Sequence, residues 1–140
     1  MLFLHKKEFD FAIRICAYLA GNKHFKPISV SKLSSTLLIT KPFATKIIYS
    51  LRQSNLIGSQ QGKTGGVFLN KNPKEISLYD ILESMGFSKT ISECITEESF
   101  CPLPSPCKIH SYFMNVENKL IDDLKRKKIS SYSFTDADLI

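Results

Sequence analysis

The sequence predicts a mainly α-helical fold: a winged helix-turn-helix with a two-stranded β wing and a long C-terminal dimerisation helix. Three observations support this prediction. Two short helical segments, separated by a tight turn, follow a longer one. A glycine-rich hairpin comes directly after them. Beyond residue 106, apolar residues recur at helical spacing for several turns.

The first helix is predicted from about Lys6 to Leu19, with Gly21-Asn22 as its stop. Its apolar residues recur every three or four positions and therefore share one buried face: Phe9, Ala12, Ile13, Cys16 and Leu19. We expect Cys16 to be a core residue rather than a metal ligand, because free cysteine is often fully buried.

The helix-turn-helix is predicted from two shorter helices. Ser29 or Ser31 caps the first, which runs to about Leu37. Thr40 caps the second, with Pro42 in its first turn, and this helix ends near residue 55. The apolar stripe of the second helix consists of Ala44, Ile47, Ile48 and Leu51.

The wing is predicted from two strand candidates, residues 56–60 and 67–69, around the glycine-rich turn 61–66. A phosphate-binding loop is the alternative for this turn. It is disfavoured because the turn lacks a Gly-Lys-Ser/Thr ending and no helix follows it.

Ser77 can cap a fourth helix from Leu78 to about Met85. The polar, proline-bearing segment 87–106 follows and is predicted to be a loop. It carries two cysteines, Cys94 and Cys101.

The final helix begins at Pro106 or Cys107 and ends near Lys127. Its apolar positions are Ile109, Phe113, Val116, Leu120 and Leu124. A helix of this length is too long for the small domain before it to cover its apolar positions, so we expect two copies of the chain to dimerise through it. The tail after Ile129 is expected to be loose or weakly packed. The predicted division is a DNA-binding domain over 1–72, a linker helix and cysteine loop over 73–106, a dimerisation helix over 107–128 and a tail over 129–140.

Charge is unevenly distributed along the chain. The net charge is +6, but residues 1–74 carry +10 and residues 75–140 carry −4. A basic first half suggests an anion-binding module, and a solvated surface of uneven charge is the alternative.

The chain has no membrane-length apolar run and no signal peptide pattern at its start, so we expect a cytoplasmic protein. Four cysteines then point to metal or redox chemistry rather than disulfides.

Three of these cysteines form a compact pattern. Cys94, Cys101 and Cys107 are spaced Cys-x6-Cys-x5-Cys on a loop that runs into a helix. Thiolates are soft ligands that select iron–sulfur clusters, zinc or Cu(I). A cluster normally needs a fourth ligand, and His110 lies one helical turn after Cys107 on the same face. A zinc site with three Cys and one His, bare thiol sensing, an inert loop and a surface role for His110 are the alternatives.

In this order, several motifs make the sequence resemble the Rrf2 family of bacterial winged-helix regulators, which includes IscR, NsrR and RirA. The resemblance covers about residues 1–125. Its marks are Asp10-Phe11-Ala12-Ile13-Arg14, Leu51-Arg52-Gln53-Ser54-Asn55-Leu56-Ile57, the wing Gly62-Lys63-Thr64-Gly65-Gly66-Val67, Ile76-Ser77-Leu78, and three cysteines before a long helix.

The resemblance implies a homodimer that binds palindromic double-stranded DNA operators, often through an iron–sulfur cluster. His110 stands at the position of the histidine ligand of IscR-like members, which bind a 2Fe–2S cluster. Asp10 stands at the place of the carboxylate that NsrR-like members supply from the partner subunit to a 4Fe–4S cluster. Otherwise Asp10 is a solvated acid paired with Lys6 or Arg14.

DNA-facing residues follow from the helix-turn-helix prediction. The recognition helix should present its first turns to the major groove, through Thr40, Lys41, Phe43, Thr45 and Lys46. Three further basic residues should contact phosphates: Lys32, Arg52 and Lys63. Gln61 stands where family members usually carry an arginine for the minor groove. Glutamine can form a hydrogen bond to a base edge, but it has no positive charge to match the negative potential of a narrow A·T minor groove. Readout of such a groove would need Lys63 to take the place of the arginine.

The function predicted from the sequence is therefore a regulator whose operator binding responds to a cluster exposed to nitric oxide, redox change or iron shortage. A cluster-free regulator that senses thiols or a metabolite, or holds zinc, is the first rival. An enzyme is disfavoured, because the chain shows no cofactor loop and no catalytic set outside the cysteine segment.

Overall fold

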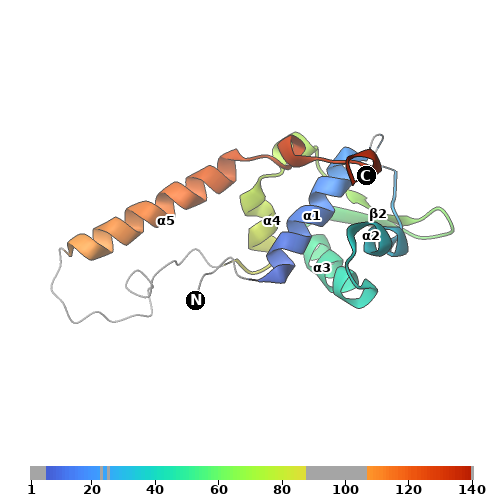
Figure 1. Ribbon diagram of the computed structural model, residues 1–140, viewed down its shortest axis with the longest axis horizontal. Coiled ribbons are helices and arrows are strands. Elements are labelled where there is room, and N and C mark those ends of the chain that lie inside the picture. The colour runs from blue at the N-terminus through green and yellow to red at the C-terminus, as the bar shows by residue number, and fades with distance from the viewer. Residues whose placement is uncertain (1–5, 23, 25, 88–106, 140) are drawn as a thin grey trace.

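The computed structural model describes residues 6–22, 24, 26–87 and 107–139. Helices α1 to α4 and a β-hairpin gather into one body, and helix α5 projects from it (Figure 1). The elements are α1 (Lys7–Gly21), α2 (Val30–Leu37), α3 (Lys41–Gln53), β1 (Ile57–Gln60), β2 (Gly66–Leu69), the 3-10 turn η2 (Pro73–Glu75), α4 (Leu78–Ser84), α5 (Lys108–Arg126) and the 3-10 turns η4 (Ile129–Tyr132) and η5 (Asp136–Leu139). The predicted mainly helical winged fold is confirmed.

Helix α1 forms the centre of the core. It contacts α2, α3, α4 and β2. Its predicted apolar face is buried, except that Ile13 is only partly covered, and Ile15 is also fully buried. Facing it are the buried α3 residues Ala44, Ile47, Ile48 and Leu51. Removing this much apolar surface from water is the main force that fixes the helix-turn-helix.

The two helices of the helix-turn-helix start differently. Ser29, rather than Ser31, caps α2 by accepting a hydrogen bond from the Lys32 amide at 3.1 Å. The predicted capping by Thr40 is wrong in its detail, because its side chain makes no capping hydrogen bond to α3. Proline at the second helical position, Pro42, has no N–H to offer, which removes one of the two amides that such a cap uses.

The wing is an antiparallel pair in which Ile57 opposes Leu69 and Gln60 opposes Gly66. Ile57, Val67 and Leu69 are buried beneath it. The chain between α1 and α2 joins its edge through two backbone hydrogen bonds between Ile28 and Val67, of 2.9 and 2.8 Å. A side chain at Gly66 would collide with the backbone of Ile28. The wing is thereby fixed to the start of α2.

Helix α4 connects the body to α5. Ser77 caps it, as the sequence predicts, and the structure adds that Ser77 and Asp80 form a full capping box. Tyr79 and Leu82 pack with Phe9 of α1 and Ile121 of α5 in a second apolar cluster. Most of the predicted loop 87–106, including Cys94 and Cys101, lies outside the described residues.

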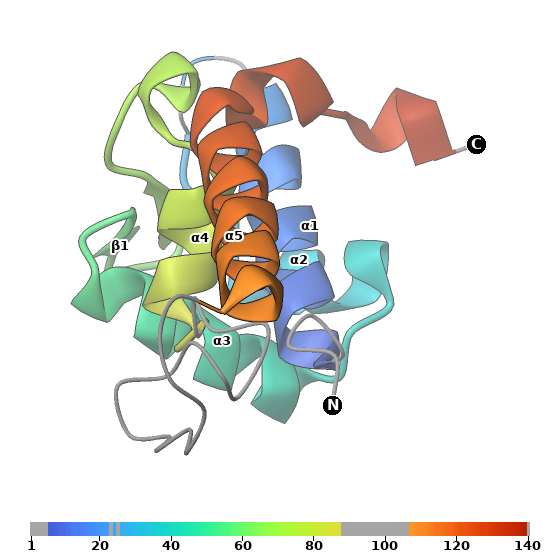
Figure 2. The ribbon, with the colours of Figure 1, turned by 90° about the vertical axis from the view of Figure 1, so that its left-hand side faces the viewer.

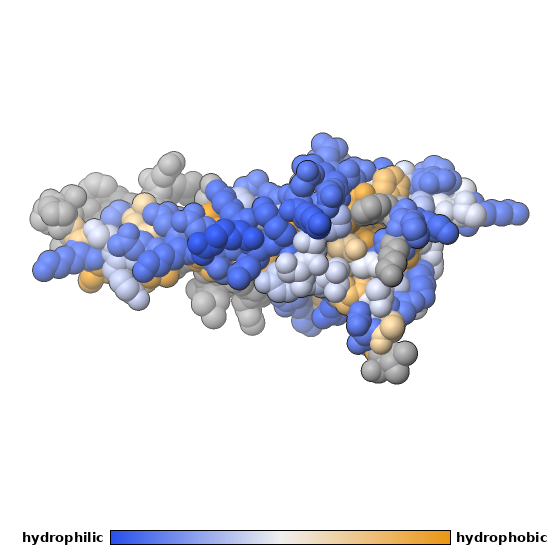
Figure 3. Space-filling model, turned by 90° about the horizontal axis from the view of Figure 1, so that it is seen from above, coloured by the Kyte–Doolittle hydropathy of each residue, from blue (hydrophilic) through white to orange (hydrophobic). Residues whose placement is uncertain are grey.

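Helix α5 confirms the predicted long C-terminal helix. Ile121 near its C-terminal end is its one buried residue, whereas Ile109 and Tyr112 are each 63% exposed. Seen from the left-hand side of Figure 1, α5 lies in front of α1 and α4 (Figure 2). Its face seen from above is mostly hydrophilic (Figure 3). Across the described residues, no helix has the combination of length and apolar character that a bilayer span requires.

The tail packs against the body through a few residues while most side chains after Ile129 are exposed, so weak packing describes it and a loose segment does not. Ile129 is fully buried, and its amide donates to the Ile76 carbonyl at 2.8 Å. Further along, Phe134 packs against the core, with its ring 5.6 Å from that of Tyr18. The segment runs back over α1 to the α2 side of the body (Figure 1). These contacts join residues far apart in sequence, so no local periodicity announces them.

Candidate DNA-binding surface and cysteine site

The first turns of α3 present an exposed polar surface. The side chains of Thr40, Lys41, Thr45 and Lys46 are exposed, as expected for the start of a recognition helix. Phe43 is half-buried, because its ring stacks edge-on against Phe11 at 5.4 Å. Helix α3 therefore offers polar and basic groups to a ligand, while Phe43 packs the helix against Phe11 of α1.

Lys46 has a partner in this structure. Its ammonium lies 3.3 Å from a carboxylate oxygen of Glu8 on α1, and both groups are at the surface. Such an exposed pair is weak and exchanges readily. Lys46 can therefore leave Glu8 for a phosphate or a base edge at small cost.

The predicted phosphate-contacting residues lie on three elements. Arg52 is exposed near the end of α3, Lys63 is exposed with Gln61 in the wing turn, and Lys32 is exposed in the first turn of α2. An open groove of about 670 Å³ runs between the wing turn and α2, and its lining includes Lys26, Lys32 and Lys63. These three ammonium groups make the groove a cationic surface suited to an anionic backbone.

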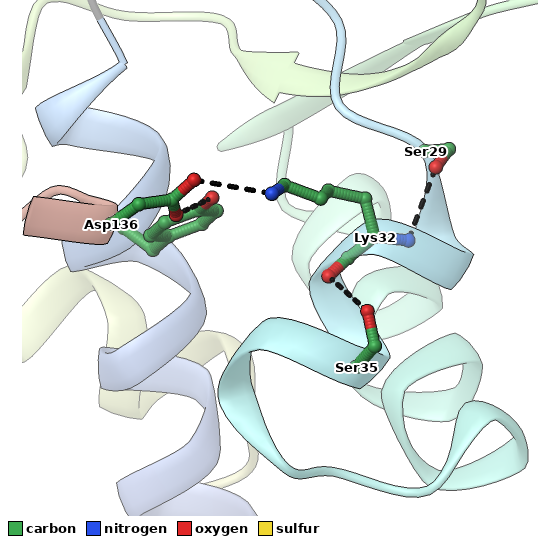
Figure 4. Close-up of polar contacts among 5 residues, drawn as sticks. Ser29, Lys32, Ser35 and Asp136 are labelled. Carbon is green, nitrogen blue, oxygen red and sulfur yellow. Dashed lines mark hydrogen bonds and ion pairs between the residues drawn. The ribbon is translucent and has the colours of Figure 1, made fainter. Parts of the chain in front are cut away.

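A carboxylate of the tail lies in the same groove. Asp136 Oδ2 accepts from the Lys32 ammonium at 3.1 Å, and its Oδ1 accepts from the Tyr18 hydroxyl at 2.5 Å (Figure 4). The Tyr18 hydrogen bond, followed by that of Lys32, lowers the pKa of Asp136. The same carboxylate raises the pKa of Lys32. Asp136 is thus held as an anion against a lysine expected to contact DNA.

Two residues of this surface, Tyr49 and Asp136, were not predicted from the sequence. Tyr49 is 62% exposed on α3, one helical turn beyond Thr45. It lies off the apolar stripe of α3, which is the signal that could have identified it. Asp136 gave no signal, because its contacts depend on how the tail folds back.

The cysteine site is described only in part. Cys107 is the half-buried residue before α5, and its side chain makes no capping hydrogen bond. His110 is exposed in the first turn of that helix, and Asp10 is exposed on α1. Arg14 does not pair with Asp10; its guanidinium donates to the Leu37 carbonyl at 3.2 Å. Within the described part of the chain, no three potential metal ligands come together.

Cys16 differs from the cysteines of that segment. It is fully buried on α1, as the sequence predicts, and desolvation raises the pKa of its thiol to about 12. A buried thiol that resists ionisation is a core side chain rather than a metal ligand.

A model of the Rrf2 family, described as an iron-dependent transcriptional regulator, matches residues 5–132. The chain is 28% identical over 101 residues to an HTH-type transcriptional regulator NsrR from Shouchella clausii, covering 71% of this chain and 68% of that protein.

Solved structures share the fold. CymR, the global cysteine regulator of B. subtilis, matches with a TM-score of 0.74 and 15% identity, over 92% of this chain and 97% of that one. IscR of T. potens matches with a TM-score of 0.68 and 18% identity, over 89% and 82% respectively. At these identities the two structures show a common fold.

Proposed function

Because the chain belongs to the Rrf2 family of transcriptional regulators, we propose that it binds operator DNA as a homodimer and that an iron–sulfur cluster controls this binding. The chain is a DNA-binding regulator and not an enzyme. The observation that carries the DNA-binding part of the proposal is the surface formed by α2, α3 and the wing, where each of these elements exposes basic side chains.

In the proposed complex, α3 enters the major groove. Lys41, Thr45 and Lys46 lie on its exposed first turns and are suited to base edges. The exposed side chain of Tyr49 extends this face by one turn. Contacts from Lys32, Arg52 and Lys63 to phosphates would fix the register without reading sequence. Gln61 lies in the same wing turn as Lys63, where its amide is suited to a base edge.

A second copy of the chain is the proposed partner of α5. Ile109, Tyr112 and Met114 are exposed on the part of α5 that leaves the body. Phe113 and Val116 lie within the same two turns and are only partly covered. A helix with this many exposed apolar side chains is stabilised when a matching helix covers them.

In this proposal Cys94, Cys101 and Cys107 hold the cluster. The fourth ligand is either His110 of the same chain or Asp10 of the partner subunit. The described donors fit such a group: Cys107 makes no capping bond, and His110 is exposed one turn along the same helix. Thiolates favour iron–sulfur clusters, and a non-cysteine ligand leaves one iron more reactive. When bound, the cluster would supply a redox-sensitive or nitric oxide-sensitive link between the cysteine segment and α5.

Iron and sulfide content of anaerobically purified protein tests this proposal. Cys94→Ala, Cys101→Ala and Cys107→Ala should each lose iron and the visible absorbance, because too few ligands remain. Cys16→Ala is the matched control and should keep both, since Cys16 is buried in the core. Wild-type protein that contains no iron when purified anaerobically, yet binds DNA, would instead support a cluster-free regulator.

The fourth ligand is tested by the same spectra. If His110 is the ligand, His110→Ala should lose or alter the absorbance while Asp10→Ala keeps it. The reverse result would assign the ligand to the partner subunit. Unchanged spectra in both variants would contradict both assignments.

A further inference from the structure

The C-terminal segment 134–139 is anchored beside the helix-turn-helix by more than one contact. The Phe134 amide donates to the Ala17 carbonyl at 3.4 Å, and its ring lies against Tyr18. A side chain at Gly21 would collide with the Phe134 carbonyl, so the absence of one at this position lets the segment approach α1. Asp138 accepts from the amide and hydroxyl of Thr135 and closes the following turn. Asp136 is therefore presented from a folded support.

Asp136 meets α2 at the point where α2 is most attractive to an anion. Lys32 is the third residue of α2, its amide donates to the Ser29 cap, and no acidic residue lies in the first turn of the helix. Asp136 provides the carboxylate that Lys32 lacks within its own helix (Figure 4). Its side chain is 58% exposed and that of Lys32 is 51% exposed, so solvent and ions reach the pair.

The surrounding groove is built for more negative charge than Asp136 supplies. Lys26, Lys32 and Lys63 line it, and Asp136 is the one acidic residue among the residues that line it in the described structure. The wing turn forms the wall opposite to α2. A DNA phosphate that binds the Lys32 ammonium would therefore compete with the Asp136 carboxylate, which lies 3.1 Å from it.

We propose that Asp136 competes with DNA phosphates for Lys32, so that the segment 134–139 restrains DNA binding until it is displaced. This inference rests on the proposed DNA-binding function and adds a regulator built into the chain itself. Exposed ion pairs are weak, so the restraint is a few-fold adjustment of affinity rather than a complete block. Salt weakens both the internal pair and the DNA contact that replaces it.

The test uses the full-length chain and a fluorescently labelled duplex of mixed sequence, because phosphate contacts do not depend on sequence. Asp136→Asn removes the charge but keeps an oxygen that can accept from Tyr18. Asp123→Asn is the matched control, since Asp123 forms an exposed pair with Arg126 on α5 and its loss changes the net charge equally. Fluorescence anisotropy over a salt series measures affinity for each variant.

We expect Asp136→Asn to bind the duplex about two- to fivefold more tightly than Asp123→Asn at low salt. Its plot of log affinity against log salt should also be steeper, by up to about one unit, because Lys32 then releases a counterion on binding. In a Lys32→Ala background, Asp136→Asn should have no further effect beyond that of Asp123→Asn.

Equal affinities of Asp136→Asn and Asp123→Asn would overturn the inference and leave the proposed function intact. Weaker binding by Asp136→Asn would also overturn it, since the carboxylate would then be holding Lys32 in place for DNA. Wild-type protein that shows no salt-dependent DNA binding would contradict the proposed function itself. Thermal unfolding of each variant confirms that the compared proteins are equally folded.

Discussion

At the scale of single residues, the chemistry of each side chain is set by its burial. Cys16 and Cys107 are both free thiols, but Cys16 is enclosed by α1 and its neighbours whereas Cys107 is half-exposed before α5. Burial removes water from the thiolate and so favours the neutral thiol. The sequence predicted this difference, because Cys16 lies on an apolar helical face and Cys107 does not.

Thiol reactivity checks this assignment in iron-free, reduced protein. With a pKa of about 12, Cys16 should remain protonated at mildly alkaline pH and resist a thiol reagent until the protein unfolds. Replacing it with alanine should therefore leave the number of reactive thiols in the native protein unchanged. The same replacement should lower the number in denatured protein by one. A lower number in the native variant would show that Cys16 is accessible.

At the scale of elements, the sequence predicted what local rules control. The helical faces, the wing turn and the Ser77 cap all depend on residues within a few positions of each other. The absence of a Thr40 cap was locally readable too, from the missing N–H of Pro42. The packing of Phe134 and the contact between Asp136 and Lys32 depend on the tail folding back onto helices about a hundred residues earlier in the sequence. No local pattern specifies such a contact.

The N-termini of α4 and α3 give a matched stability test, because Ser77 caps the first with its side chain and Thr40 does not cap the second. Ser77→Ala should lower the free energy of unfolding by about 1 kcal/mol, because the amide of Asp80 loses its acceptor at a buried helix start. Thr40→Ala should change it by less than about 0.5 kcal/mol, since Thr40 makes no capping bond. Urea denaturation monitored by circular dichroism measures both. Equal losses would contradict the difference between the two starts.

At the scale of the whole molecule, charge and shape divide the chain into two parts. The first 74 residues carry a charge of +10 and form α1, α2, α3 and the wing, which make up the body together with α4. The projecting α5 carries exposed apolar side chains instead. The proposed dimer would join two copies through α5 and present two basic surfaces to one duplex. Its two recognition helices should then contact half-sites about one helical turn, or a multiple of it, apart.

Salt dependence tests this arrangement. A dimer with two such surfaces should make on the order of 6–10 phosphate contacts, so its affinity should fall about 10³–10⁵-fold between 50 and 200 mM salt. Lys63→Ala should weaken binding to all duplexes and reduce the salt slope by about one unit. Lys46→Ala should cost about 1–3 kcal/mol on the operator and relax base preference there. Equal effects of Lys46→Ala on operator and scrambled duplexes would remove its assigned base contact.

The most direct test of cluster-controlled DNA binding is operator affinity measured by fluorescence anisotropy under anaerobic conditions, before and after iron is removed from the same preparation. We predict a visible absorbance from the cluster, strong salt dependence of binding, and an operator affinity that changes when iron is lost. The change should disappear in Cys107→Ala protein, which cannot hold the cluster. The account would be contradicted by an operator affinity that is identical with and without iron, in protein whose iron content has been verified before each measurement.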